Sequence, residues 1–437
     1  MQRLWRFLYS YGIIPCVWML VQIVGLLKRK VRRGIVGRRN LMEHLSAQMR
    51  RIGAGKRVWF HASSLGEFEQ AKPIIAELKH RYPDVRIITT FFSPSGYEHS
   101  RKYPLADVIS YLPFDSLSNA RRFVECVRPD VAVMVRYDIW PNHIWEMEQH
   151  EIPVMIANAT MRSTTQRRIL LSKNFHHHVY NAIGAILTVS EGDARAFSTF
   201  KLTRPVVRAI GDTRYDQVSL RSAEARKRHI VPSRILEGQK VIVAGSTWPE
   251  DDQVVIPAFL RILEEAARTL LILVPHEPTI DHLEEVEAEL DGKTKHIRFS
   301  ALNEYTDERV IIVDSIGILL TLYSHAHIAY VGGSFRQGIH NVLEAAVFGI
   351  PVIFGPKHRN SEEPLRLVEH GGGFVVNDTA ELLRTLRNLL EDERARSTAG
   401  ERAATFVRSN IGATAHFLEH LEPYLSNGAQ HMTGRRR

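Results

Sequence analysis

Residues 328–356 read IAYVGGSFRQGIHNVLEAAVFGIPVIFGP. Two short apolar runs, at residues 328–331 and 351–354, enclose a glycine-rich turn and a helical pattern that begins around Asn341. Short apolar runs that alternate with amphipathic helical stretches are typical of parallel strands covered by helices. This stretch therefore predicts a strand–helix–strand unit of an α/β fold.

The same alternation continues on both sides of this stretch. In the C-terminal half, further strands are expected at residues 241–244, 270–274, 310–313 and 374–376. In the N-terminal half, six strands are expected at residues 58–62, 85–92, 108–112, 131–135, 154–159 and 185–189. The polar region 212–237 lacks a strong apolar run and is expected to be a linker. A chain of 437 residues also exceeds the size that one core usually supports. We therefore expect two α/β domains with a cleft between them and ligands at the carboxyl ends of the strands.

A charge-free segment and a basic block follow one another near the N-terminus. No charged side chain occurs from Phe7 to Leu27, and a helix needs about 20 apolar residues to cross a bilayer. Residues 28–39 then hold seven lysines and arginines. Such a block suits nucleic acid or anionic lipid head groups. Its position after an apolar segment indicates lipid, and it marks the cytoplasmic side of a membrane. Residues 1–30 are therefore expected to anchor the protein, and no nucleic-acid partner is expected.

Three interpretations of this segment differ in where it lies. A cleaved signal peptide is disfavoured because no small-x-small cleavage site precedes Lys28. A spanning helix and a helix lying in the membrane surface both stay open, since Gly12 and Pro15 interrupt the pattern. The only two cysteines, Cys16 and Cys126, offer no disulfide framework, which fits a reducing compartment.

Candidate site residues of the first domain follow its strands. The loop at residues 61–67 reads HASSLGE, and its small residues Ser64 and Gly66 permit a tight turn and the approach of a ligand. Glu67 is either a first-turn acid that complements the helix dipole or a general base within reach of a hydroxyl. In the later loop RYDIWPN, Asp138 is either a helix N-cap or part of the same site.

The second domain also has polar and glycine-rich turns after its strands. Pro275 and His276 follow one strand, and a lone histidine there is more often structural than ligand-binding. Asn341 and Glu344 fit a capping box. Alternatively, amides released by the glycines bind a phosphate at the helix N-terminus, and Glu344 accepts hydrogen bonds from a ribose. The glycine-rich approach favours this nucleotide site.

Signatures of several other ligand sites are missing from the sequence. A zinc-protease helix, a P-loop and a GxGxxG fingerprint do not occur. The three consecutive histidines at residues 176–178 would point in different directions on a helix, so one metal ion could not easily be held by them. We expect a solvated helix face there and no bound metal.

Together these motifs resemble the 3-deoxy-D-manno-octulosonic acid (Kdo) transferases of lipopolysaccharide assembly, which are glycosyltransferases of the GT-B architecture. The resemblance covers nearly the whole chain and is carried by residues 61–67, 140–142, 332–334, 338, 340–344 and 349–356. It implies an N-terminal membrane-anchor helix and two Rossmann-like domains facing a cleft. We place the anchor at residues 1–30, the acceptor-binding domain at 31–215, the nucleotide-sugar domain at 216–425 and a disordered tail at 426–437.

The resemblance also implies a reaction and its partners. Kdo would move from CMP-Kdo to a hydroxyl of the lipid A precursor (lipid IVA), with inversion and without a metal. Glu67 matches the catalytic base, and Ser64, Gly66 and Asp138 are expected on the acceptor side. The positions that match the family's CMP contacts or lie beside them are Pro275, His276, Ile316, Gly317, Ile318, Gly333, Ser334, Asn341, Val342, Leu343 and Glu344. The implied location is an anionic membrane surface, the cytoplasmic face of the bacterial inner membrane.

The chain departs from the family pattern at three places. His276 stands where many relatives have an arginine, Ile318 where glutamate is frequent, and residues 136–138 where Glu-Thr-Glu is frequent, so Asp138 is the only acid left there. The cations that could replace the missing arginine are Arg336, Lys357 and Arg359.

Two alternative functions stay open at this stage. One is another membrane-associated GT-B enzyme that uses a different sugar nucleotide; a sugar-nucleotide epimerase, however, would need no anchor. The other is a non-catalytic nucleotide-binding scaffold, which would tolerate the loss of Glu67.

Overall fold

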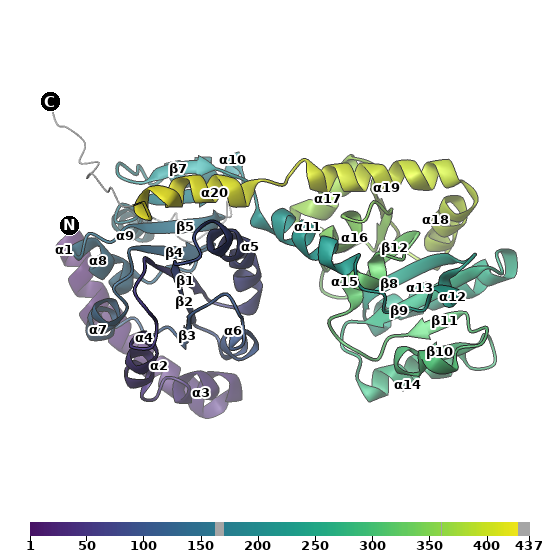
Figure 1. The fold of residues 1–437 in the computed structure, drawn as a ribbon, viewed down its shortest axis with the longest axis horizontal. Helices are drawn as coiled ribbons and strands as arrows, with labels where there is room; N and C mark the ends of the chain where they lie inside the picture. The colour runs from purple at the N-terminus through teal and green to yellow at the C-terminus, as the bar shows by residue number, and fades with distance from the viewer. Residues whose placement is uncertain (162–169, 360, 427–437) are drawn as a thin grey trace. The chain divides into compact units, whose positions relative to one another are not determined.

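The computed structural model describes residues 1–161, 170–359 and 361–426. They form two compact units, one made of Met1–Gln217 with Gly412–Arg437 and the other of Val218–Ile411. Each unit is built on a seven-stranded parallel sheet with helices on its faces (Figure 1). The prediction of two parallel-sheet α/β domains is confirmed.

The first sheet has the strand order β3-β2-β1-β4-β5-β6-β7. Its strands are β1 (Arg57–Ala62), β2 (Arg86–Phe91), β3 (Val108–Tyr111), β4 (Val131–Val135), β5 (Val154–Ala159), β6 (Ala185–Thr188) and β7 (Val206–Ala209). The helices of this unit after its N-terminal segment are α4 (Leu41–Met49), α5 (Leu65–Arg81), α6 (Pro94–Ser100), α7 (Leu117–Val127), α8 (Pro141–Gln149), α9 (Leu170–Tyr180), α10 (Glu191–Ser198), α20 (Ala413–Leu421) and the 3₁₀ turn η4 (Glu422–Tyr424).

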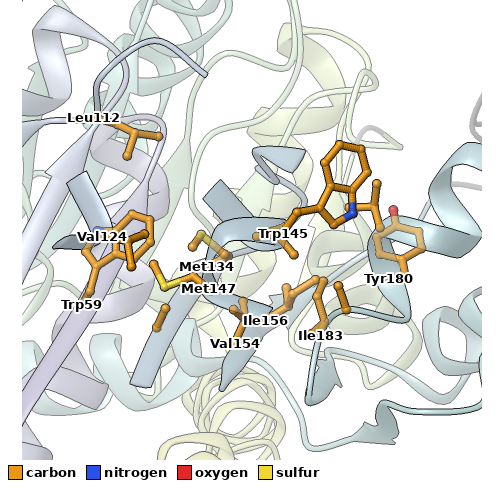
Figure 2. Close-up of a cluster of buried hydrophobic side chains, with 14 of the residues drawn as sticks. Trp59, Leu112, Val124, Met134, Trp145, Met147, Val154, Ile156, Tyr180 and Ile183 are labelled. Carbon is orange, nitrogen blue, oxygen red and sulfur yellow. The ribbon is translucent and has the colours of Figure 1, made fainter. Parts of the chain in front are cut away.

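Both faces of the first sheet are buried, which explains the continuous apolar runs of its strands. Successive side chains of a strand point to opposite faces. On β1, Trp59 packs in the cluster of Figure 2, together with Met134 and Ile156 of neighbouring strands. Val58 and Phe60 pack in a second cluster on the other face. Two filled layers therefore fix the register of the strands and hold their carboxyl ends in place.

The N-terminal segment is a long helix that lies against the first unit. It comprises α1 (Gln2–Phe7), the π-helical turn η1 (Leu8–Ile13) and α2 (Ile14–Leu27), and α3 (Arg29–Val36) follows. Within the described residues, Gln2–Leu27 is the one helix long and apolar enough to cross a membrane. The tyrosine hydroxyl of Tyr9 donates to Asp115 at 2.9 Å, and the indole N–H of Trp5 donates to Asn174 at 2.7 Å. The first half of the helix is thus hydrogen-bonded to its own domain.

The second sheet has the strand order β10-β11-β9-β8-β12-β13-β14. Its strands are β8 (Lys240–Thr247), β9 (Thr269–Pro275), β10 (His296–Arg298), β11 (Val310–Ile312), β12 (Ile328–Val331), β13 (Val352–Phe354) and β14 (Gly373–Val375). Its helices are α12 (Ser233–Leu236), α13 (Pro249–Glu265), α14 (Ile280–Leu290), η3 (Phe299–Glu304), α15 (Leu319–Tyr323), α16 (Leu343–Ala346), α17 (Glu362–Glu369), α18 (Thr379–Glu391) and α19 (Glu393–Arg408).

The domain boundaries differ from the expected ones in two respects. The expected linker contains α11 (Thr213–Ala225), and the units divide inside this helix, between Gln217 and Val218. The chain from Gly412 belongs to the first unit, whereas residues 216–425 were expected in the second. The physical reason is packing, since Phe417, Leu418 and Leu421 of α20 fill the core of the first sheet. Of the expected disordered tail, residues 427–437 lie outside the described residues.

Candidate functional site

The strand order of each sheet indicates where a ligand would bind. In the first unit β1 lies between β2 and β4, and in the second β8 lies between β9 and β12. The chain therefore leaves these neighbouring strands in opposite directions. Open α/β sheets bind ligands at such a point, beyond the carboxyl ends of the strands. The loops after β1 and β4, and those after β8, β9 and β12, are the candidate sites.

Glu67 lies in the first turn of α5, directly after the loop that leaves β1. Its carboxylate accepts a hydrogen bond from the backbone N–H of Ser64, the N-cap residue, at 2.9 Å. The side chain is only 7% exposed. Burial raises the pKa of Glu67 and the charge of Asp138 raises it further, while hydrogen bonds from Ser64 and Ser63 act in the opposite direction. The capping role and the electrostatics of a base are thus combined in one residue.

Asp138 does not cap a helix, so that alternative is wrong. Helix α8 has Trp140 as its N-cap residue. The Oδ2 atom of Asp138 lies 2.8 Å from His61 Nε2 and accepts the indole N–H of Trp140 at 3.1 Å. His61 Nδ1 in turn lies 2.9 Å from the hydroxyl of Thr90, which accepts the indole N–H of Trp59 at 2.8 Å. Asp138 therefore ends a hydrogen-bonded chain that runs through the sheet.

The pKa of Asp138 is shifted opposite to that of Glu67. Burial alone would raise it, but the hydrogen bond and charge of His61, with the hydrogen bonds of Trp140 and Ser63, hold the pKa of Asp138 below its usual value. Asp138 stays ionised at neutral pH beside a carboxylate that binds its proton more tightly. Pairs of groups whose pKa values are pushed apart in this way are typical of acid–base sites.

Gly66 lies next to Glu67 and faces open space. A Cβ atom added at Gly66 would meet no other atom within 4 Å. Its backbone needs no positive φ either, because Gly66 lies outside the residues with that conformation. Packing therefore does not require a glycine at this position, and the space beside Glu67 is available to a ligand.

His61 and Thr90 belong to this site; the sequence analysis included His61 in the motif 61–67 without giving it a role, and it did not single out Thr90. They are opposite each other in the register of β1 and β2 and are fully buried. The available signal was a histidine within the apolar run of β1 and the pair Thr89–Thr90 within that of β2. Buried polar groups need partners, so their coincidence in register could have indicated a network.

In the second unit, buried Asp251 holds the glycine-rich loop in place. Its carboxylate accepts the backbone N–H of Gly333 at 2.8 Å, the backbone N–H of Trp248 at 3.0 Å and the hydroxyl of Tyr330 at 2.8 Å. Asp251 is a site residue that the sequence did not reveal, because its three partners come from β12, from the turn after it and from the start of α13.

The two glycines after β12 are required by close packing. A Cβ at Gly332 would lie 2.4 Å from the carbonyl oxygen of Ser246. Gly333 has φ +94, and a Cβ there would lie 2.6 Å from the carbonyl oxygen of Gly338. The backbone N–H groups of Gly333, Gly338 and His340 all donate within the protein. These three amides therefore fix the shape of the loop, contrary to the expectation that the glycines free them for an anion.

An aromatic and cationic cluster lies at the carboxyl ends of β8, β9 and β12. The rings of His276 and His340 are stacked with centroids 4.2 Å apart. Trp248 donates its indole N–H to His340 Nε2 at 2.9 Å, and the guanidinium of Arg336 lies 4.1 Å from the centre of the Trp248 ring. His276 is exposed. Burial is the main cause that lowers the pKa of His340 to about 4, and the nearby His276 lowers it further. The cluster thus joins His276 to Arg336.

The other expected donor contacts differ in how accessible they are. Ile316 is 81% exposed, in the turn after β11 that also holds Gly317 and Ile318. Ser334 is fully buried, and its hydroxyl accepts the backbone N–H of Gly355 at 2.6 Å. Pro275 is buried as the last residue of β9.

The capping box expected at Asn341 and Glu344 is absent, so that alternative is wrong. The side chain of Asn341 instead accepts the backbone N–H of Leu343 at 3.2 Å. Glu344 lies 3.3 Å from Arg221 in an ion pair. Val342 and Leu343 are buried and therefore hold this turn in place. Asn341 is exposed and Glu344 half-buried, and both lie just after the glycine-rich loop.

The run of three histidines in α9 is not a fully solvated face. All three are half-buried, and His177 Nδ1 lies 2.8 Å from the carbonyl oxygen of Phe200. In the described part of the chain, no group of three or more His, Cys, Asp or Glu side chains is arranged to hold a metal ion.

Comparisons with known proteins identify relatives of this chain. A family model described as "3-Deoxy-D-manno-octulosonic-acid transferase (kdotransferase)" matches residues 35–217. The 3-deoxy-D-manno-octulosonic acid transferase of Haemophilus influenzae is 30% identical over 436 residues, which cover 97% of this chain and 99% of that protein. The protein of the same name from Aquifex aeolicus is 31% identical over 365 residues, covering 80% and 94%.

A solved structure has the same fold. The UDP-GlcNAc 2-epimerase of Neisseria meningitidis, bound to UDP-GlcNAc, matches with a TM-score of 0.59 over 84% of this chain and 99% of that one. At 15% sequence identity this likeness shows the fold alone.

Proposed function

The chain belongs to the family of 3-deoxy-D-manno-octulosonic acid (Kdo) transferases, and from this membership we propose that it moves Kdo from CMP-Kdo to a hydroxyl of lipid IVA, with Glu67 as the general base. Family membership makes the chain a glycosyltransferase of lipopolysaccharide biosynthesis. The observation that supports the role of Glu67 is a buried carboxylate of raised pKa at the switch point of the first sheet.

The proposed reaction needs a base on the acceptor side. The acceptor hydroxyl attacks the anomeric carbon of Kdo, the bond from that carbon to the phosphate breaks, and CMP leaves. Glu67 takes the hydroxyl proton during the attack. Its raised pKa strengthens it as a base, because proton transfer is most effective when the pKa of the base approaches the working pH. Open space beside Gly66 and the ionised Asp138 are the features that suit the acceptor side.

We propose that CMP binds at the carboxyl ends of the strands in the second domain. The contacts would come from Pro275, His276, the turn at residues 316–318 and the segment from Gly333 to Glu344. Arg336 is the best candidate to replace the arginine found in relatives, since it packs on Trp248 next to His276. Lys357 is less suited because its ammonium donates to the carbonyl oxygens of Phe335 and Arg336. Fixed cations beside a leaving phosphate stabilise its charge, so we propose that transfer needs no metal ion.

We propose that the N-terminal helix holds the enzyme on the cytoplasmic face of the inner membrane. Several of its apolar side chains are exposed, with Leu4, Phe7, Ile23, Leu26 and Leu27 each more than half exposed. Basic helix α3 follows directly and suits anionic head groups. An acceptor that is itself a membrane lipid would then meet Glu67 at the membrane surface.

A transfer assay tests the proposal. Purified protein is incubated with CMP-Kdo and lipid IVA, and the lipid mass is followed, with parallel reactions that contain UDP-N-acetylglucosamine or EDTA. We expect the lipid mass to increase by the mass of Kdo with CMP-Kdo and to stay unchanged with UDP-N-acetylglucosamine. We expect the same increase with CMP-Kdo when EDTA is present. Transfer from the UDP-sugar in its place would favour the alternative donor, and loss of transfer in EDTA would contradict the metal-free mechanism.

Two substitutions of Glu67 separate its two roles. Glu67→Gln keeps a capping side chain, since glutamine also serves at this position of a capping box, but it cannot accept a proton. We expect this variant to unfold at the wild-type temperature and to lose about 100-fold or more in kcat. Glu67→Ala should lose both activity and about 1 kcal/mol of stability. An active Glu67→Gln variant would leave capping as the only role of the residue.

A further inference from the structure

A cavity of about 600 Å³ lies in the first domain and has no role in the function proposed so far. Its walls come from α2, α3, α4 and α7 and from the segments that follow β2 and β3. Sites for small molecules usually enclose about 300–1,000 Å³, so its size suits a ligand. The apolar part of its lining includes Val21, Val31, Ile35 and Met42.

The charged groups of this cavity are mostly cationic. Its lining contains Lys30, Arg38 and Arg122 and one carboxylate, Glu43. Lys30, Arg122 and Glu43 are exposed and therefore lie toward solvent. The cavity thus combines an apolar interior with a net positive charge, which suits a ligand with an apolar tail and an anionic head.

Arg38 adds to this positive charge from a half-buried position in the cavity wall. Its guanidinium donates to the carbonyl oxygens of Leu112, Gly34 and Phe92 at 2.8, 2.8 and 2.7 Å. In the part of the chain that the structure describes, these hydrogen bonds go to neutral carbonyl groups and none goes to a carboxylate. A half-buried cation whose hydrogen bonds go to neutral groups favours the approach of an anion.

The cavity shares a wall with the candidate catalytic site. Phe92, Ser93 and Pro94 line it. The backbone N–H of Ser93 donates at 2.8 Å to the carbonyl oxygen of Ser63, in the loop that leads to Glu67. The ring of Phe92 packs against Trp140, with centroids 4.5 Å apart. One layer of residues therefore separates the cavity from the Glu67 and Asp138 network.

The cavity also adjoins the exposed apolar surface of the N-terminal helix. Trp18 lines the cavity and is 43% exposed. Ile23 of the same helix is 52% exposed. A lipid held by this surface would therefore have an apolar route into the cavity.

We propose that this cavity binds one acyl chain of the acceptor lipid, with Lys30 and Arg122 facing a phosphate of its head group. The inference rests on the proposed function, because it assigns a subsite to the acceptor of that reaction. It gives the cavity a role in the reaction: the acyl chain in the cavity positions the sugar hydroxyl at the base. It also assigns part of the acceptor specificity to the length and presence of an acyl chain.

Filling the cavity tests the proposal. Val21→Trp and Met42→Trp each place a large ring into the cavity from a different wall, and Leu20→Trp is the matched control on the exposed side of the same helix. Each protein is assayed with lipid IVA and with the same lipid after removal of its acyl chains. Burial of about two methylene groups changes an equilibrium constant about tenfold. We therefore expect both cavity variants to raise KM for lipid IVA at least tenfold.

The deacylated acceptor shows whether a variant is still folded and active. Val21→Trp and Met42→Trp should use it with wild-type kcat and KM, and Leu20→Trp should behave as the wild type with both acceptors. Equal effects of Val21→Trp and Leu20→Trp would overturn the proposal. So would a rise in KM for both acceptors alike.

Photo-crosslinking separates this proposal from the proposed function. Lipid IVA with a diazirine at the end of an acyl chain is irradiated with the full-length protein, and the labelled peptides are identified by mass spectrometry. We expect labels in α2, α3 and α4, lost in Val21→Trp and kept in Leu20→Trp. Labels only outside these helices would overturn the proposal that the cavity binds an acyl chain. Labelling of the cavity walls without any Kdo transfer would support acyl-chain binding in the cavity and contradict the proposed function.

Discussion

Two carboxylates at the end of the first sheet differ in the partners that surround them. Glu67 is buried with backbone donors, and its pKa is raised, whereas Asp138 is joined to His61 and Trp140, and its pKa is lowered. Nothing in the local sequence distinguishes these two acids. The difference comes mainly from His61, which reaches Asp138 only when β1 and β4 lie side by side, and further from Trp140 and Ser63.

This coupling predicts the pH dependence of the reaction. A base with a raised pKa is protonated at a higher pH than a free glutamate, so kcat/KM should fall on the acid side at a pH above that of an ordinary carboxylate. Asp138→Asn removes the negative charge that raises the pKa of Glu67. We expect the acid limb of the kcat/KM profile to move to lower pH in this variant. An unmoved limb would show that the charge of Asp138 does not act on the base.

His340 predicts a separate dependence of stability on pH. Its pKa is about 4 in the folded protein against 6.5 in an unfolded chain. Between these values the unfolded state binds more protons, so this stability is complete above pH 6.5 and is lost as the pH falls toward 4. His340→Gln keeps an acceptor for Trp248 and cannot titrate. After allowance for partial exposure, wild type should lose about 1–2 kcal/mol more than the variant between pH 7 and 4.5, measured by denaturant unfolding.

At the scale of elements, the sequence predicted buried structure better than edges and loops. All twelve apolar runs are strands, and eleven of them lie within one residue of the expected bounds, whereas β8 extends three residues further, to Thr247. The two strands that were not expected, β7 and β10, lie at sheet edges and have partly exposed side chains. An edge strand is paired and covered on fewer sides, so it needs no continuous apolar run. The loop amides of Gly333 and Gly338 were also predicted wrongly, because the acceptor of Gly333 is Asp251 of α13 and that of Gly338 is formed only when the loop folds back on Gly333.

Substitution by alanine is expected to have opposite effects on stability at two of the glycines. Gly332→Ala would place a Cβ 2.4 Å from the carbonyl oxygen of Ser246. The backbone at Gly332 and that at Ser246 cannot move apart without disturbing the pairing of β12 with β8. We expect the Gly332→Ala variant to unfold at a clearly lower temperature, with a loss of about 2 kcal/mol or more. Gly66→Ala meets no atom and should gain up to about 1 kcal/mol in α5. Thermal unfolding of both variants checks this, and a destabilised Gly66→Ala would show that packing requires that glycine.

At the scale of the whole molecule, the N-terminal helix decides how the chain meets a membrane. Composition alone left a spanning helix and a surface helix open. Tyr9 donates to Asp115, a fully buried residue that also accepts the backbone N–H groups of Asn142 and His143. The ring of Tyr9 packs on Trp145 with centroids 5.7 Å apart. A helix that spans the bilayer would have to give up these contacts, so they favour the surface position.

The two positions of the helix predict different sides for its ends. A surface helix keeps residues 3 and 28 on the cytoplasmic side, whereas a spanning helix puts them on opposite sides. Both residues are exposed, so Arg3→Cys and Lys28→Cys can each be made in a chain that carries Cys16→Ser and Cys126→Ser. An impermeant maleimide should label both cysteines in inverted inner-membrane vesicles and neither in spheroplasts. Labelling of Arg3→Cys in spheroplasts alone would show that the helix crosses, and the contacts of Tyr9 would then not persist in the membrane.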